Sequence, residues 1–176
     1  MHDRGAFWSP VPDWSTATLD GAGVRVVAVA DAEPIRLVSG DVPAFLSRIV
    51  TLPFAGLHEA RVLLRYGLRL APDRVLVVAS GMDELPSGWH DAGFAVTDVS
   101  AGYVFIDVTG AGAPSVMAQG SGLDFSAPPG TAEASAALLF AGLPVAIARR
   151  ADGWRLHIER PLATALWTWL KVALTP

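Results

Sequence analysis

Apolar and polar residues alternate along much of the chain in short runs, a pattern typical of β-strands with one face turned to a core. Tight turns at residues 71–74 and 151–154 each join two such runs, so we expect hairpins and therefore antiparallel sheets. The strands predicted most clearly are residues 24–29, 62–70, 74–79, 103–109, 136–140, 145–148 and 154–159.

The chain contains an internal repeat. Residues 35–54 align with residues 105–125 when one residue is inserted, and the segments 70–78 and 150–158 form a second matched pair. In each copy a strand leads through a glycine turn to a short helix and later to a hairpin, which predicts a single α+β domain built from two similar units. The two repeats are predicted at about residues 20–88 and 94–176.

Each repeat is expected to contain a short helix after its glycine turn. In the first, Asp41 occupies the N-cap position and Pro43 the first turn, where the missing N–H of proline costs no hydrogen bond. The second helix, near Pro114, is expected to be shorter because the sequence runs into Gly120 and Gly122.

The last helix, which begins at Pro161, has more apolar surface than one core requires. Its polar residues occupy a stripe of only roughly 60°, whereas a helix that covers one core needs an apolar face of about 100° or somewhat more. Either the helix is covered within its own chain, or part of it faces another chain. The residues predicted for such an interface are Leu166, Trp167, Leu170 and Leu174.

Composition indicates a large buried area. Only 17% of the 176 residues are charged, against roughly 25% in typical soluble domains, and 52% are hydrophobic. We expect part of this apolar excess between the repeats and part on a surface covered by a partner. The longest uncharged apolar stretch, residues 134–148, is too short for a membrane span, and the N-terminus lacks a signal-peptide pattern, so a cytoplasmic protein is expected.

The charge pattern argues against nucleic-acid binding. None of the 13 cationic residues lies between Arg74 and Arg149, a stretch that carries seven acidic residues, whereas recognition of a phosphate backbone needs clustered cations. The chain has no cysteine, which excludes disulfides, thiolate metal ligands and thiol catalysis.

Few residues are placed for chemistry. The histidines at positions 2, 58, 90 and 157 show none of the spacings that pair metal ligands, and no nucleophile or phosphate-binding motif occurs, so neither catalytic nor metal-binding residues are predicted. His157 is expected to be a hydrogen-bonded histidine within a strand. Arg149 and Arg150 are interpreted as a solvated hairpin end, with a carboxylate-binding site as the alternative.

Asp98 lies in an apolar neighbourhood, where a carboxylate must find hydrogen-bond donors or acquire a raised pKa. We expect it to accept hydrogen bonds from backbone N–H groups of the turn that follows. Asp98 and Ser100 are also the candidates for contact with a cofactor if this chain binds one.

Residues 94–126 and 141–170 together resemble the gamma subunit of heterotetrameric sarcosine oxidase. The resemblance rests on Asp98-Val99-Ser100, a strand that ends at Gly110, the turn at residues 122–125, the hairpin around Asp152-Gly153 and the tryptophan-rich last helix. That family is similar in turn to the folate-binding domain of glycine-cleavage aminomethyltransferases. The resemblance implies a fold of two ferredoxin-like units with antiparallel sheets.

The resemblance also implies a function. The family's complex oxidises sarcosine to glycine; its larger alpha and beta subunits bind FAD, FMN and NAD, and tetrahydrofolate accepts the one-carbon unit in the alpha subunit. This chain would bind none of these cofactors, and it would be a supporting subunit with no activity of its own.

Two departures from the related families bear on the alternatives. Residues 140–146 contain no acid where the aminomethyltransferases have an acidic pair, so aminomethyl transfer by this chain alone is not expected. Ser121 stands in the region where the gamma family commonly has a cysteine. A free-standing tetrahydrofolate-binding protein is the main alternative, whereas relatives that assist iron–sulfur assembly need a cysteine that this chain lacks.

Overall fold

A computed structural model describes residues 10–30, 32–49, 52–54, 65–79, 86–126 and 137–175. Its strands are β1 (Thr18–Gly21), β2 (Val24–Ala28), β3 (Ile35–Gly40), β4 (Arg65–Ala71), β5 (Arg74–Ala79), β6 (Gly88–His90), β7 (Phe94–Asp98), β8 (Tyr103–Thr109), β9 (Ala137–Phe140), β10 (Leu143–Arg150) and β11 (Gly153–Glu159). Its α-helices are α1 (Val42–Arg48), α2 (Ala113–Gly120) and α3 (Arg160–Ala173).

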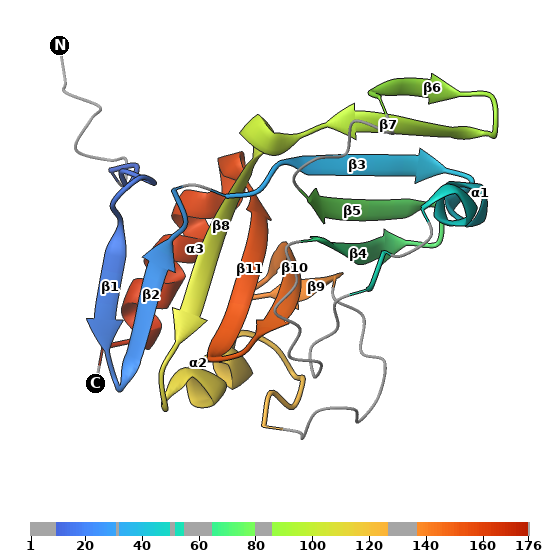
Figure 1. Cartoon of the computed structure of the whole chain (residues 1–176). Coiled ribbons are helices and arrows are strands. Elements are labelled where there is room, and N and C mark those ends of the chain that lie inside the picture. Colours follow the sequence, from blue (N-terminus) through green and yellow to red (C-terminus); the bar gives the residue numbers. More distant parts are fainter. Residues whose placement is uncertain are drawn as a thin grey trace, which may run out of the picture.

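The strands form two sheets, and Figure 1 shows that the strands of one cross the direction of the other. The first sheet has the order β1-β2-β8-β11-β10-β9, and the second has the order β4-β5-β3-β7-β6. Every pairing between these strands is antiparallel, as the tight hairpins predicted. The α+β fold class with antiparallel sheets is therefore confirmed.

The two sheets share part of their strand order. The hairpin β4–β5 lies beside β3, and the hairpin β10–β11 lies beside β8 in the same arrangement. The remaining hairpins are exchanged between the sheets: β1–β2 precedes β3 in sequence but joins β8, while β6–β7 precedes β8 but joins β3. Both predicted repeats therefore contribute strands to both sheets, and β6 begins at the last residue of the first predicted repeat and runs into the segment between them.

Gly40 and Gly110, which match in the sequence repeat, have a common physical role. Both have φ in the left-handed region, at 110° and 106°, and a Cβ at either would overlap a backbone carbonyl, that of Gly93 or of Gly23. Each glycine thus lets the end of a central strand pass close to the turn of its exchanged hairpin.

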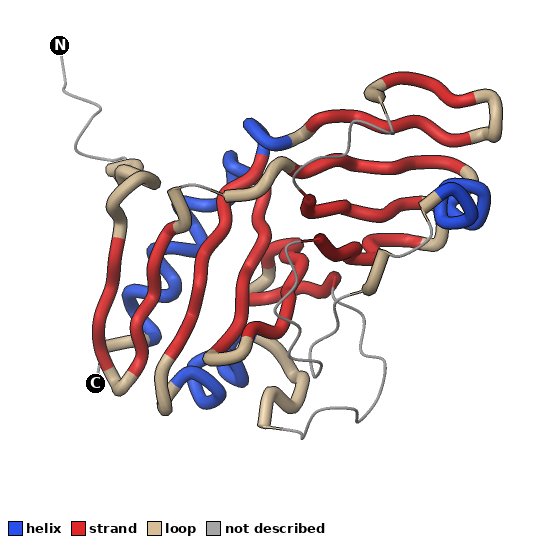
Figure 2. Tube along the Cα trace, in the orientation of Figure 1, coloured by secondary structure: helices blue, strands red, loops and turns tan. Residues whose placement is uncertain are grey.

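Three apolar cores fill the layers. One lies between the first sheet and the helices α2 and α3, and a second lies between the second sheet and α1 (Figure 2). The third, here called the inter-sheet core, joins the two sheets through residues such as Ile35, Tyr66 and Phe105. Central strands are therefore buried on both faces, which explains the high apolar content of the chain.

The first two helices show one confirmed prediction and one error. The Asp41 carboxylate accepts a hydrogen bond from the Ala44 N–H at 2.9 Å, as expected of an N-cap. The second helix, α2, has eight residues and α1 has seven, so the expectation of a shorter second helix is wrong. Gly120 does not end α2 early; it leaves room for the Phe140 ring, which a Cβ there would overlap.

The last helix packs into the chain's own core. Leu166, Trp167, Leu170 and Leu174 are 0%, 8%, 0% and 5% exposed, and the Trp14 ring meets the Trp167 ring edge-on at 5.7 Å. The four residues predicted for an interface with another chain are thus covered within this chain, because the first sheet and the N-terminal turn bury that face. None of the helices in the described residues is long and apolar enough to cross a membrane.

Candidate functional site

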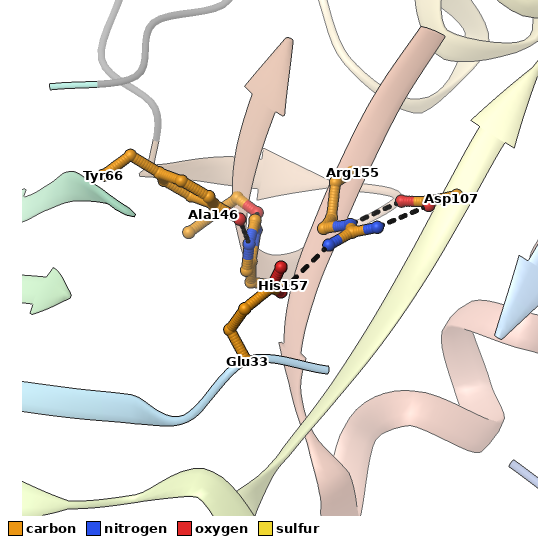
Figure 3. A network of polar contacts seen from close by, with 6 residues as sticks. All are labelled: Glu33, Tyr66, Asp107, Ala146, Arg155 and His157. Atoms are coloured by element: carbon orange, nitrogen blue, oxygen red, sulfur yellow. Dashed lines mark hydrogen bonds and ion pairs between the residues drawn. The ribbon is translucent and has the colours of Figure 1, made fainter. Parts of the chain in front are cut away.

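A buried polar network lies between the two sheets, and β11 supplies its two central residues. Alternation along β11 turns Trp154 and Leu156 toward the helices, and it turns Arg155 and His157 toward the second sheet. Figure 3 shows both side chains in the inter-sheet space, with Asp107 coming from the neighbouring strand β8.

Arg155 is held mainly by Asp107, its direct partner in the β8–β11 register. The Arg155 Nε and Nη2 atoms donate to the two Asp107 carboxylate oxygens, each at 2.7 Å, in a bidentate pair. Glu33 lies farther, with 3.5 Å between its Oε2 and the Arg155 Nη1. Burial opposes the guanidinium charge, but the hydrogen bonds and charge of Asp107 outweigh it and raise the pKa of Arg155. The guanidinium is a fixed cation.

His157 is kept neutral and in one tautomer. Its Nδ1 lies 2.9 Å from the Ala146 carbonyl oxygen, which can only accept, so Nδ1 carries the proton. The Tyr66 hydroxyl then donates to Nε2 at 2.7 Å and links the second sheet to the first. Burial lowers the pKa of His157 to about 3 and raises that of Tyr66. Both ring nitrogens are therefore engaged, and the pair serves to join the sheets.

Asp98 has the structural role expected of it. Its carboxylate accepts hydrogen bonds from the Ser100 backbone N–H at 2.9 Å and from the Ser100 hydroxyl at 2.7 Å, and these bonds lower the pKa of Asp98. The Ser100 hydroxyl oxygen in turn accepts from the Ile35 N–H at 2.9 Å. The two residues together fix the passage from β7 to β8 against the start of β3.

His90 and Arg149 make their contacts outside this network, whereas the charge of Arg150 acts on both Tyr66 and His157. His90 stacks on the Phe94 ring and contacts the Pro86 carbonyl oxygen, and the Arg149 guanidinium lies 4.0 Å from the centre of the Trp154 ring. His2 and His58 lie outside the described residues. Within the described ranges no group of three or more His, Asp or Glu side chains could hold a metal ion.

Two pockets border the inter-sheet core and share Tyr103. The larger has a volume of about 250 Å³, and Ser100, Glu33 and Arg160 are among the residues that line it. The smaller has a volume of about 180 Å³ and reaches His157 and Glu159. Of the two candidate cofactor contacts, only Ser100 therefore lines either pocket; Asp98 is exposed beside it.

Comparison with solved structures identifies the fold. A chain of the heterotetrameric sarcosine oxidase from Corynebacterium sp. U-96, solved in complex with pyrrole 2-carboxylate, matches with a TM-score of 0.63 and 20% sequence identity. The match covers 89% of this chain and 87% of that chain. This chain has the fold of a sarcosine oxidase chain. No protein-family model matches the sequence, and no curated protein sequence matches it.

The resemblance stated from the sequence is thus confirmed at the level of the fold. Sequence reasoning did not find the contacts of Arg155, Asp107, Glu33 and Tyr66. Two signals were present: Asp107 interrupts an otherwise apolar strand, and Arg155 shares the strand face of His157. The pairing with Glu33 and Tyr66 joins positions far apart in sequence, which alternation within one strand does not reveal.

Proposed function

We propose that this chain is a non-catalytic, gamma-type subunit of a heterotetrameric, flavin-dependent sarcosine oxidase complex in the cytoplasm. The observation that carries the proposal is the fold match, which extends over nearly the whole of both chains. In such a complex the larger alpha and beta subunits bind FAD, FMN, NAD and tetrahydrofolate, and this chain supports them without a cofactor of its own.

The described polar residues support this role. Arg155 and Asp107 neutralise one another, and His157 has both nitrogens engaged, so these groups do not offer a base beside a nucleophile. The two pockets, at about 250 and 180 Å³, are smaller than the roughly 300–1,000 Å³ of sites for drug-sized ligands. Neither of these two pockets is large enough to enclose a molecule of the size of a folate.

Exposed apolar side chains offer contacts to a partner. Trp89 on β6, Leu139 on β9 and Val172 on α3 are 70%, 68% and 68% exposed. Aromatic side chains such as that of Trp89 are enriched at the buried centre of protein interfaces, and exposed Leu and Val side chains add apolar area. We propose that contacts to larger subunits use such residues in place of the four buried residues of α3.

The proposal is tested by purification of the tagged chain from its native host. Recovery together with two larger subunits that show flavin absorbance would support it, whereas a monodisperse chain recovered alone would contradict it. The tetrahydrofolate alternative makes a different prediction, because a ligand that binds only the folded state raises Tm. A rise in Tm with tetrahydrofolate in the isolated chain would favour that alternative.

A further inference from the structure

The second sheet leaves one row of side chains exposed on the inter-sheet face of the first sheet. This row, here called the uncovered row, consists of Tyr103, Glu159, Pro144 and Leu139, one from each of the strands β8, β11, β10 and β9. Glu159, Pro144 and Leu139 are exposed, whereas His157 in the neighbouring row is buried and bonded to a side chain of β4. Figure 3 shows His157 in the space between the sheets.

A pocket lies where the uncovered row meets β4. It is the smaller of the two pockets, with a volume of about 180 Å³, and Leu70, Leu138 and Val145 give it apolar walls. All of its lining residues belong to strands that the structure describes. A cavity of about 150 Å³ holds a benzene ring, so this pocket accommodates one large apolar side chain, such as that of phenylalanine or leucine.

Glu159 brings an unpaired negative charge to this pocket. It is the only charged residue that lines it, and its carboxylate forms no ion pair within the described part of the chain. It also makes no capping hydrogen bond at the start of α3. The adjacent Arg160 donates instead to the Ala101 and Tyr103 carbonyl oxygens. Burial and then the charge of Glu159 raise the pKa of Tyr103, so the carboxylate acts on the pocket wall.

The backbone of β9 offers hydrogen bonds at the same place. β9 is the last strand of its sheet, and a two-residue turn at Ala141-Gly142, with φ of 52° and 77°, joins it to β10. In such a hairpin the residues that flank the turn exchange hydrogen bonds, so the N–H and C=O of Leu139 point away from β10. The residues that the structure describes form no hydrogen bond to these two groups. An extended protein segment can therefore pair with Leu139 beside the pocket.

We propose that an extended segment of a larger subunit docks on the uncovered row, with one bulky apolar side chain in the pocket and a neighbouring lysine or arginine at Glu159. This inference rests on the proposed function, because it takes the occupant to be part of the complex. The charge of Glu159 selects the cationic neighbour, and the apolar walls and volume select the large side chain. Docking also covers Leu139, which is 68% exposed.

The test is recovery of the flavin-containing subunits with the tagged chain from its native host. Leu139→Asp and Glu159→Lys are each expected to lower this recovery by about tenfold or more, because one removes an apolar contact and the other opposes the cation. The matched controls are Val11→Asp, at an apolar residue that is 71% exposed, and Asp152→Lys, in the exposed β10–β11 turn. Both controls should copurify as the unchanged chain does.

A milder variant separates the ion pair from the fold. In Glu159→Gln, which keeps the shape of the side chain, Tm of the isolated chain should stay unchanged. Raising the salt concentration from about 0.05 M to about 1 M should weaken the complex severalfold with the unchanged chain and clearly less with this variant. An equal salt dependence of the two complexes would overturn the assignment of a cation to Glu159.

The outcomes distinguish this inference from the proposed function. If the unchanged chain copurifies and the Leu139 and Glu159 variants copurify equally well, the docking site is wrong and the proposed function stands. If the unchanged chain is recovered alone, both are overturned. An isolated chain that forms a dimer, and that Leu139→Asp converts to a monomer, would assign the uncovered row to a second copy of this chain and would also overturn the inference.

Discussion

Replacement of Tyr66 by Phe tests whether the buried hydrogen bond to His157 holds the two sheets together. The change removes one oxygen atom, keeps the ring in the inter-sheet core, and leaves the His157 Nε2 without its donor at 2.7 Å. A buried acceptor left unpaired costs about 1–3 kcal/mol. For a chain of 176 residues this corresponds to a fall in Tm of roughly 2–12 °C.

The assay is thermal or urea unfolding of the full chain. Tyr103, the second of the chain's two tyrosines, is a matched control because it is half-buried and its hydroxyl makes no described hydrogen bond. Tyr103→Phe is expected to change stability by less than about 0.5 kcal/mol. In a His157→Phe background, Tyr66→Phe should cost nothing or even stabilise, because its hydroxyl then lacks a partner. Equal costs of Tyr66→Phe in both backgrounds would refute the reasoning.

Three further predictions concern the cores. The folded chain keeps His157 neutral down to about pH 3, whereas in the unfolded chain this histidine takes up a proton near pH 6.5. The free energy of unfolding should therefore fall by up to about 1.4 kcal/mol for each pH unit below 6.5. Between pH 7 and pH 4, Tm should fall less in the His157→Phe variant than in the unchanged chain. Gly120→Ala should cost about 1–3 kcal/mol in urea unfolding because its Cβ overlaps a phenylalanine ring of β9, whereas Gly122→Ala, which meets open space, should be close to neutral. Trp167→Glu places a charge in the core and should abolish cooperative unfolding, whereas Val172→Glu, on the exposed side of the same helix, should preserve it. A Trp167→Glu chain that still folds would contradict the burial of α3 in the core of its own chain.

The sequence was informative where the determinants are local. Alternation located most strands, and Asp41, Pro43 and the glycine turns located the first helix, because a cap or a turn depends on a few neighbouring residues. The length of α2 was predicted wrongly because the glycine at position 120 is required by the Phe140 ring, twenty positions away in sequence, and not by the end of the helix. The four interface residues of α3 were misplaced for a similar reason: which face of an apolar helix is covered depends on Trp14 and the first sheet.

The polar site was predicted only in part. The expectation for His157, a hydrogen-bonded histidine in a strand, is confirmed, and so is the turn bonded by Asp98. Tyr66 comes from the other sheet and Glu33 from the segment that precedes β3, and their approach follows from the packing of two layers. No residue spacing within either repeat predicts that these side chains meet, so the larger pocket, which Glu33 and Arg160 help to line, is recognised only in the folded structure.

The exchange of hairpins between the sheets has a consequence for biosynthesis. The strand β2 leaves the ribosome long before β8, with which it pairs from Arg25 to Ala28, and β8 cannot be complete until residue 109 has been made. Until then the β1–β2 hairpin has no sheet to join, and its apolar residues stay exposed. Contacts this distant in sequence slow folding and expose the nascent chain to aggregation. Fragments cut between β5 and β6 would each lack one hairpin, so each should need the other in order to fold.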